Sequence, residues 1–293
     1  MNASMVERVR GFNRVVTERM GALDDDFLGR GRPLGESRML WEIGLDGAEV
    51  RQLRRRLGMD SGYASRLLRS LEAEGLIAVE TAAPDRRVRH ARLTAAGVAE
   101  RAELDRLAEE VATSVLEPLD ERQRNRLVAA MEDVERLLLA SLITIAVEDP
   151  ATDDARWCVE QYFAELARRF EGGFDPALSI PAATEDLTPP AGLLLVARRR
   201  ERPVGCGALK LHGRGPAELK RMWVASETRG AGLGRRLLGC LEQCARDAGA
   251  AAVRLETNGA LVEAIALYRQ SGYEEVEAFN REPYAHHWFA KTL

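Results

Sequence analysis

The first half of the chain shows a helical period of apolar residues. Met5, Val9, Phe12 and Val16 fall on one stripe, which predicts an amphipathic helix over residues 4–20. Capping and breaking residues, with Asp46 as one expected N-cap, predict further helices over 34–43, 46–57, 61–74, 94–116 and 121–140. Two strand-like runs, 76–80 and 88–93, are joined by a turn at 83–86. The first half is therefore expected to be mainly helical.

The pattern changes near residue 141. Strand-like runs at 142–147, 192–198, 203–211, 217–224, 252–257, 273–279 and 286–292 alternate with helical stretches at 155–170, 234–248 and 260–271. This alternation indicates an α/β domain with a mixed, mostly antiparallel sheet. The polar segment 148–154 is the expected connector. We predict two domains, a mainly α domain over 1–140 and an α/β domain over 141–293.

Composition excludes several classes of protein. The 293 residues are 46% hydrophobic and 30% charged, which is globular composition and not that of a disordered chain. Four cysteines are too few for a disulfide scaffold. No apolar run approaches the roughly 20 residues of a membrane helix, and the N-terminal stretch lacks the apolar segment of a signal peptide. We expect a cytoplasmic protein with reduced thiols and no membrane partner.

Basic residues cluster in two places, although the net charge is −4. Six arginines and one acid lie between Arg51 and Arg69, and four arginines and no acid lie between Arg86 and Arg92. The first cluster falls on two short helices separated by a glycine turn, and the second on the hairpin that follows. This arrangement predicts a winged helix-turn-helix and a polyanionic partner. The alternative is a solvated face on a helical dimerisation module.

The helix over residues 61–72 is the predicted recognition helix. Leu67, Leu68 and Leu71 form its apolar face, so its outward residues are expected to reach bases and phosphates in the major groove. Arginines of the hairpin would reach the minor groove and the backbone. The candidate DNA-contacting residues on these two elements are Ser61, Tyr63, Ser65, Arg66, Arg69, Arg86, Arg87 and Arg89. Tyr63 alternatively packs on the helix surface.

The same stretch resembles a known family of regulators. LGMDSGYASRLLRSLEAEGLI followed by PDRRVRHARLTAAG is similar to the MarR-type regulators, and Asp85 and Arg87 match that family's Asp-x-Arg wing signature. The resemblance covers about residues 4–140. It implies a homodimer whose first helix and last two helices form the interface. Two recognition helices would then bind a pseudo-palindromic operator in double-stranded DNA.

A glycine-rich turn in the second half carries the main chemical signal. The run RGAGLGR at residues 229–235 lies between the predicted strand 217–224 and the predicted helix 234–248. Such a turn presents bare backbone N–H groups and the positive end of a helix dipole, which together bind a pyrophosphate. A dinucleotide-binding fold is the competing interpretation. That fold expects G-x-G-x-x-G in a parallel βαβ unit, whereas the order here is R-x-x-G-x-G after several strands.

This turn resembles motif A of the GNAT N-acetyltransferases. The segment LETN at 255–258 and the segment ALYRQSGY at 266–273 are similar to the second CoA-contacting motif of that family. The resemblance covers about residues 141–293. It implies acetyl-CoA as the donor, a primary amine as the acceptor, and direct transfer without a covalent acyl-enzyme.

The resemblance also implies roles for individual residues. The expected CoA-contacting residues are Met222, Trp223, Val224, Arg229, Gly230, Ala231, Gly232, Leu233, Gly234, Arg235 and Asn258. Tyr268 matches the tyrosine that protonates the departing thiolate, and it is otherwise a core tyrosine. Glu218 is the candidate base, because an amine must be neutral before it attacks; it is otherwise a solvent-facing strand residue. Asn258 is alternatively the N-cap of the next helix.

Other candidate residues point to the core more than to chemistry. Cys240 and Cys244 stand four residues apart on a predicted helix, but no third ligand accompanies them, so we expect buried cysteines and no metal site. Cys206 is expected in the core of a strand. The His-His-Trp run at 286–288 would line the acceptor pocket or belong to an edge strand.

Three functions fit these observations. The first is a dimeric DNA-binding regulator that also acetylates an amine, with DNA affinity that depends on acetyl-CoA or on the acceptor. The second is a pure regulator whose α/β half senses acetyl-CoA or another ligand without turnover. The third is an enzyme whose helical half only dimerises it. The arginine clusters on both DNA-facing elements disfavour the third, and the acceptor cannot be read from the sequence.

Overall fold

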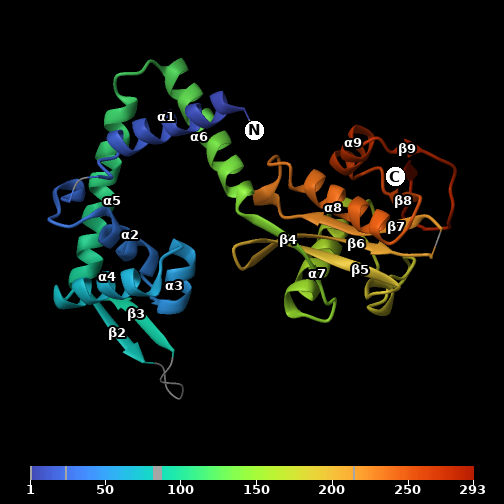
Figure 1. Cartoon of the computed structure of the whole chain (residues 1–293), viewed down its shortest axis with the longest axis horizontal. Coiled ribbons are helices and arrows are strands. Elements are labelled where there is room, and N and C mark those ends of the chain that lie inside the picture. Colours follow the sequence, from blue (N-terminus) through green and yellow to red (C-terminus); the bar gives the residue numbers. More distant parts are fainter. Residues whose placement is uncertain (1, 24, 82–87, 214) are drawn as a thin grey trace. The chain divides into compact units, whose positions relative to one another are not determined.

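The computed structural model describes residues 2–23, 25–81, 88–213 and 215–293 of the chain (Figure 1). The chain divides into two compact units, Met1–Val128 and Ala129–Leu293. The expected boundary after residue 140 and the boundary between the units both fall within the helix α6 (Glu121–Ser141). In the described part of the chain, no helix is both long and apolar enough to cross a bilayer.

The first unit is mainly helical, as the sequence predicts. Its helices are α1 (Ala3–Arg19), the short η1 (Phe27–Gly29), α2 (Leu34–Ile43), α3 (Val50–Leu57), α4 (Ser61–Ala73), α5 (Ala95–Leu116) and the start of α6. Among its described residues, β1 (Ala48–Glu49), β3 (Arg89–Leu93) and β2 (Ile77–Thr81) form an antiparallel sheet in that order. Met39, Leu40, Leu53, Leu68 and Leu71 are buried between α2, α3 and α4.

Local signals set most helix ends in this unit. Asp60 caps α4 by accepting a hydrogen bond from the Tyr63 N–H at 2.9 Å, and Gly58 ends α3 in the left-handed conformation with φ +64°. The expected cap at Asp46 is wrong, because α3 begins at Val50. Residues 48–49 instead pair with residues 90–91 of β3, so a strand contact between distant residues replaces the predicted first turn.

Gly97 marks a close contact between α5 and the segment that precedes β2. A Cβ atom there would lie 1.9 Å from the Leu76 carbonyl oxygen, so the backbone of one of the two segments would have to shift. We expect Gly97→Ala to lower the free energy of unfolding of the first unit by about 1–3 kcal/mol. Gly11→Ala in the exposed helix α1 is the control, where alanine should instead add about 0.5–1 kcal/mol. Urea unfolding followed by circular dichroism measures both, and equal effects would contradict the packing argument.

The second unit is an α/β domain built on one sheet. Its strands are β4 (Ile143–Glu148), β5 (Gly192–Arg199), β6 (Arg202–Lys210), β7 (Ala217–Val224), β8 (Ala252–Thr257), β9 (Glu274–Glu275) and β10 (His287–Thr292). In the described residues they lie in the order β4-β5-β6-β7-β8-β10-β9, and β7 with β8 is the parallel pair. Its helices are α7 (Asp153–Arg169), the short η2 (Glu185–Leu187) and η3 (Ser226–Thr228), α8 (Leu233–Asp247) and α9 (Val262–Gln270). The predicted mixed, mostly antiparallel sheet is confirmed.

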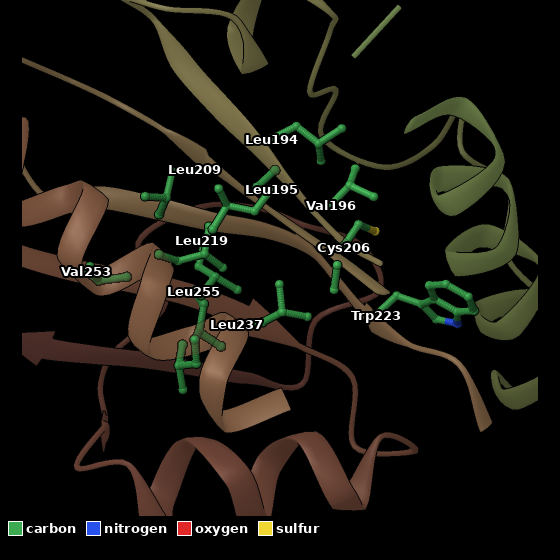
Figure 2. Packing of buried hydrophobic residues seen from close by; sticks show 14 of the residues in the cluster. Leu194, Leu195, Val196, Cys206, Leu209, Leu219, Trp223, Leu237, Val253 and Leu255 are labelled. Carbon is green, nitrogen blue, oxygen red and sulfur yellow. The ribbon is translucent and has the colours of Figure 1, made fainter. Parts of the chain in front are cut away.

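The core of this unit lies around the central strands (Figure 2). Both α7 and α8 contact β5, β6 and β7, and β6 is buried without interruption from Val204 to Leu209. A strand covered on both faces carries apolar or small residues at every position rather than at alternate ones. Cys206 is fully buried there, as predicted.

Two sequence expectations are corrected in this unit. The polar segment 148–154 joins β4 to α7 inside one domain rather than joining the two domains, because β4 pairs with β5 along its full length. The predicted strand at 273–279 shortens to Glu274–Glu275, since the described pairing with β10 involves those two residues.

Candidate active site and candidate DNA-contacting surface

The parallel strands β7 and β8 separate soon after they meet. Their ladder consists of the pairs Ala217–Val253 and Glu218–Arg254 and then ends. Beyond this point the β8-facing edge of β7 has backbone groups that the ladder does not use, and an extended ligand can pair with such an edge. Met222, Trp223 and Val224, predicted from the sequence to contact CoA, lie on this diverging part of β7.

A β-bulge re-aims side chains at the same point of β7. Cys206 lies opposite Trp223 and Ala208 lies opposite Lys220, so Arg221 and Met222 both face one residue of β6. Arg221 has φ +57°, a conformation that non-glycine residues seldom adopt. Bulges recur next to active sites because they redirect a side chain. The sequence reasoning missed this bulge; a glycine inside an apolar strand, here Gly207, was the available signal.

The glycine-rich turn opens helix α8 as predicted. Gly230 and Gly232 have φ +77° and +78°, and Gly232 is the N-cap of α8. Both positions use the left-handed conformation that glycine adopts without strain. The N–H groups of the first turn of α8 have no partner within the helix, and together with the helix dipole they form an anion-binding arrangement.

The remaining residues of the turn hold it in place. The Arg229 guanidinium bonds to Glu165 Oε2 at 2.5 Å and to the Val224 carbonyl oxygen at 3.0 Å, so it ties the turn to α7 and β7. Leu233 is buried, and a Cβ at Gly234 would lie 3.3 Å from Leu267 of α9. Ala231 is half-buried, and Arg235 donates to Gln270 at 3.0 Å.

One pocket contains several of the predicted residues. It lies where β7 and β8 diverge, and its lining includes Met222, Asn258 and Tyr268. Tyr268 is buried on α9, and this burial raises the pKa of its phenol, so the hydroxyl stays protonated at neutral pH. Asn258 donates to the Tyr284 carbonyl oxygen at 2.7 Å and accepts from the Ala260 N–H at 2.8 Å. Its side chain thus orders the loop before α9 at the edge of the pocket.

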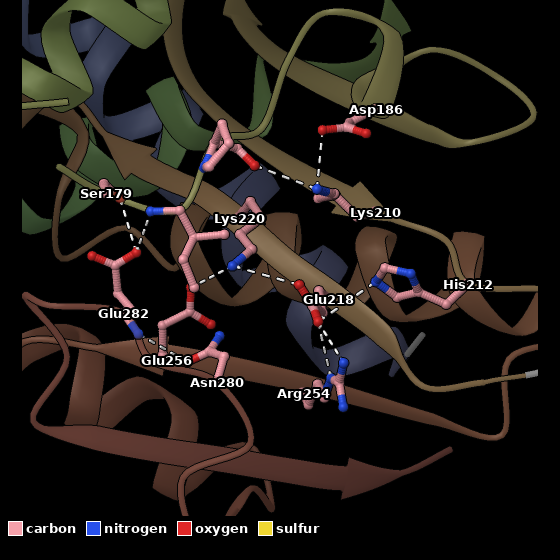
Figure 3. A network of polar contacts seen from close by, with 12 residues as sticks. Ser179, Asp186, Lys210, His212, Glu218, Lys220, Arg254, Glu256, Asn280 and Glu282 are labelled. Carbon is pink, nitrogen blue, oxygen red and sulfur yellow. Dashed lines mark hydrogen bonds and ion pairs between the residues drawn. The ribbon is translucent and has the colours of Figure 1, made fainter. Parts of the chain in front are cut away.

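Glu218 lies in an ion-pair network beside this pocket rather than among its lining residues (Figure 3). Its carboxylate accepts from Arg254 at 2.5 Å and lies 3.6 Å from Lys220 Nζ and 3.5 Å from His212 Nε2. Burial by itself raises the pKa of Glu218, but the Arg254 hydrogen bond and the charges of Lys220 and Arg254 bring it below its ordinary value. In this arrangement the Glu218 carboxylate is therefore a weak proton acceptor.

Glu256 is a carboxylate that the sequence reasoning missed. It lines the pocket, and its Oε1 pairs with Lys220 Nζ (Figure 3). Its Oε2 is buried and has no hydrogen-bond partner among the described residues. The available signal was its position two residues before Asn258, on the strand that leads into the pocket.

The other candidate residues lie elsewhere. His287 Nδ1 lies 2.6 Å from Glu275 Oε1 and Trp288 donates to Asn280 at 2.8 Å, so the run 286–288 supports the β9–β10 edge and is not part of the pocket lining. Cys240 and Cys244 are half-buried. Within the described ranges, no group of three or more His, Cys, Asp or Glu residues is arranged to hold a metal ion.

The outward face of α4 carries the predicted recognition residues. Ser61, Tyr63, Arg66 and Arg69 are exposed and Ser65 is half-buried, while the opposite face is buried. Arg89 is exposed on β3, whereas Asp85, Arg86 and Arg87 lie outside the described residues. The Tyr63 hydroxyl also sits against α2, since a Cβ at Gly35 would lie 2.5 Å from it. The packing alternative for Tyr63 therefore has structural support.

Helix α1 is apolar on one side yet buries none of its residues in the single chain. Met5, Val9 and Phe12 are 65%, 57% and 46% exposed. Val128 and Met131 of α6 are exposed in the same way. Apolar stripes of this kind on soluble proteins mark contact surfaces.

Comparisons with known proteins match separate families to two parts of the chain. The family described as "Acetyltransferase (GNAT) domain" matches residues 190–275, and the family described as "MarR family" matches residues 30–88. An IAA acetyltransferase of Azospirillum brasilense is 41% identical over 135 residues, which cover 45% of this chain and 85% of that protein. An uncharacterized N-acetyltransferase of Schizosaccharomyces pombe is 30% identical over 135 residues, covering 45% of this chain and 81% of that protein.

Solved structures also resemble parts of the chain. A putative acyl-CoA N-acyltransferase from Klebsiella pneumoniae is 28% identical, with a TM-score of 0.41, and covers 52% of this chain and 98% of that one. A probable transcriptional regulator from Pseudomonas aeruginosa is 23% identical, with a TM-score of 0.38, and covers 44% of this chain and 98% of that one.

Proposed function

The chain belongs to the GNAT acetyltransferase family and joins that domain to a MarR-family domain, and from this premise we propose a DNA-binding regulator that transfers an acetyl group from acetyl-CoA to an amine. The observation that carries the enzymatic part is the placement of Tyr268 in the pocket where β7 leaves β8. A buried, protonated phenol is available there as a proton donor.

The residues around this pocket fit acetyl-CoA. The turn at 229–234 and the first turn of α8 supply N–H groups for the pyrophosphate. The free edge of β7 at 222–224 pairs with the pantetheine arm, and Asn258 holds the adjoining loop. Acetyl-CoA supplies an activated thioester, and the Tyr268 hydroxyl protonates the thiolate as the carbon–sulfur bond breaks. No residue of this scheme has to form a covalent bond to the acetyl group.

The amine needs a proton acceptor before it attacks. Glu218 is the candidate from the sequence, but its carboxylate already accepts from Arg254 and is paired with Lys220 outside the pocket lining. Glu256 is the better-placed carboxylate, because it lines the pocket and one of its oxygens is unpaired among the described residues. A base with a free oxygen at the pocket wall needs no relay.

The helical unit acts as a DNA reader in this proposal. The exposed residues of α4 enter the major groove, and the hairpin contacts the neighbouring minor groove. The apolar faces of α1 and α6 are covered by a second copy, which places two recognition helices on a pseudo-palindromic operator. A protein that binds genomic DNA and consumes acetyl-CoA is expected in the cytoplasm.

Thiol release tests the enzymatic proposal. The full-length protein is given acetyl-CoA with amino acids, polyamines, arylalkylamines, aminoglycosides and a lysine peptide, and free CoA thiol is measured. We expect turnover with at least one class of amine and none without an amine. Calorimetry reports acetyl-CoA binding in parallel. Binding without turnover on any acceptor would overturn the enzyme and favour a sensor domain.

A further inference from the structure

The pocket beside Tyr268 has a wall of aromatic rings. Phe163 and Phe174 are stacked with ring centroids 5.5 Å apart, and Tyr284 lies 4.8 Å from Phe174. Phe170 lies 5.8 Å from both Phe174 and Tyr284. All four rings line the pocket, although α7, the loop after it and the segment before β10 supply them separately. Such a wall favours a flat apolar group, because aromatic rings stack or meet edge to face at these separations.

The two carboxylates of the pocket lining differ in whether their oxygens already accept hydrogen bonds. Glu282 Oε2 accepts from Ser179 Oγ at 3.0 Å and from the Ile180 N–H at 2.7 Å (Figure 3). Its Oε1 accepts from the Tyr284 N–H at 3.3 Å. Glu256 pairs with Lys220 through Oε1 only. Its side chain is 9% exposed, and its Oε2 has no partner in the described part of the chain. A buried carboxylate oxygen without a donor is costly, so it is the place for a cationic group of a ligand.

The two basic side chains of the pocket lining differ in whether they are paired with a carboxylate. Lys220 is paired with Glu218 and Glu256. Arg221, aimed by the bulge, donates to the Ala182 carbonyl oxygen at 3.3 Å and lies 4.3 Å above the Phe163 ring. Among the described residues it forms no ion pair with a carboxylate, and burial lowers its pKa below the ordinary arginine value. A half-buried guanidinium without a counter-ion, next to an aromatic ring, is a site for a planar anion.

Resting on the proposed acetyl transfer, we infer that the acceptor is an aromatic amino acid. Its ammonium binds Glu256 Oε2, its carboxylate binds Arg221, and its ring lies against the wall formed by Phe163, Phe170, Phe174 and Tyr284. The four charged groups of the pocket lining, Lys220, Arg221, Glu256 and Glu282, sum to zero, which suits a zwitterion. A polycation would meet Lys220 and Arg221, and an amine without a carboxylate would leave Arg221 unpaired.

The chemistry balances with these groups alone. Glu256 takes one proton from the ammonium and later passes it to water. The neutral nitrogen forms the carbon–nitrogen bond as the carbon–sulfur bond breaks, and Tyr268 gives its proton to the thiolate. The second nitrogen proton then returns to the Tyr268 oxygen. The products are the N-acetyl amino acid, CoA thiol and one proton in water.

Matched acceptors test the inference on the wild-type protein. L-phenylalanine is compared with phenethylamine, which lacks the carboxylate, and with L-alanine, which lacks the ring. Spermidine and a lysine peptide complete the set. We expect kcat/KM for phenylalanine to exceed that for phenethylamine and for alanine by about 10- to 100-fold, since the pocket then leaves Arg221 or the ring wall unused. Equal values, or a preference for spermidine or the peptide, would overturn the inference.

Two substitutions test which charged side chain binds which group of the acceptor. Arg221→Gln should remove the preference for phenylalanine over phenethylamine, and Glu256→Gln should weaken both acceptors. Arg168→Gln and Glu160→Gln, on exposed positions of α7, are the controls and should preserve the ratio. If Arg221→Gln does not fold, Arg221→Lys keeps a charge but loses the planar contact, so a partial loss of the ratio is expected.

Equilibrium binding separates this inference from the proposed activity. Calorimetry without acetyl-CoA gives the affinity of the pocket for phenylalanine, for phenethylamine and for 3-phenylpropionate, which lacks the amine. If phenylalanine binds more tightly than phenethylamine and Arg221→Gln abolishes that difference, the carboxylate assignment stands even when no acetyl transfer occurs. If phenylalanine also binds more tightly than 3-phenylpropionate and Glu256→Gln abolishes that difference, the ammonium assignment stands as well. Turnover on other amines without phenylalanine binding refutes the inference and leaves the enzyme intact.

Discussion

Tyr268→Phe is expected to lower kcat for acetyl transfer by about 10²- to 10⁴-fold, the usual contribution of a positioned general acid. The substitution removes one hydroxyl from a buried ring and keeps its packing against Phe289 and Tyr273. Because the pyrophosphate and the pantetheine arm are bound by other elements, the affinity for acetyl-CoA should change by less than about twofold. Steady-state thiol release gives kcat, and calorimetry gives the dissociation constant of acetyl-CoA.

Tyr273→Phe is the matched control. Tyr273 is equally buried and its ring lies 5.8 Å from that of Tyr268, yet it is not part of the pocket lining. Burial raises the pKa of both phenols, so the two tyrosines differ in whether they line the pocket rather than in the direction of their pKa shift. We expect the control to keep its rate. Similar losses in both variants would show that the loss does not come from the proton of Tyr268 and would overturn its role as general acid.

The double variant Arg66→Ala, Arg69→Ala is expected to weaken operator binding by about 30-fold or more, at about 1–3 kcal/mol for each lost contact. Both side chains are exposed on the outer face of α4, where the buried leucines of the opposite face fix their direction. If they contact phosphates, the slope of log affinity against log salt should also fall by about one for each arginine.

An operator for this measurement comes from selection of random duplexes by the full-length protein. Arg106→Ala is the control, because Arg106 is exposed on α5 and its charge is already paired with Glu103 and Glu110. Its affinity and salt slope should match those of the wild-type protein. If the double variant keeps wild-type affinity, α4 is not the recognition helix and the basic cluster is a solvated face.

Local signals in the sequence were sufficient for most elements. The helix α2 was predicted at its observed ends, and Thr94 caps α5 by accepting a hydrogen bond from the Gly97 N–H at 3.1 Å. The strand β8 was also predicted at its observed ends, because its apolar residues alternate with polar ones. Such signals act over a few residues and do not depend on distant parts of the chain.

Local signals failed where distant residues interact. The start of α3 shifted from Asp46 because β1 pairs with β3, about forty residues further along the chain. The bulge at Arg221 arises from the register of β7 against β6. The pairing of β1 with β3 leaves no pattern that can be recognised in a short window of sequence, and Gly207 indicates a bulge without showing which residues of β7 lie opposite it.

The candidate active site divides in the same way. The sequence by itself determined the glycine turn that opens α8, because glycines and a helix start are local signals. Its resemblance to a known family predicts that Asn258 and Tyr268 act with this turn, and the structure places Asn258 and Tyr268 in one pocket lining. Only the tertiary structure decided which carboxylate faces the pocket. Lys220 and Glu256 are 36 residues apart, and their pairing depends on how β7 and β8 diverge. In the described structure, that divergence leaves Glu256 with an oxygen that has no partner and Arg221 without a carboxylate partner. The sequence does not show this, because strand register and burial are properties of the assembled sheet, whereas helix caps and apolar periodicity are local.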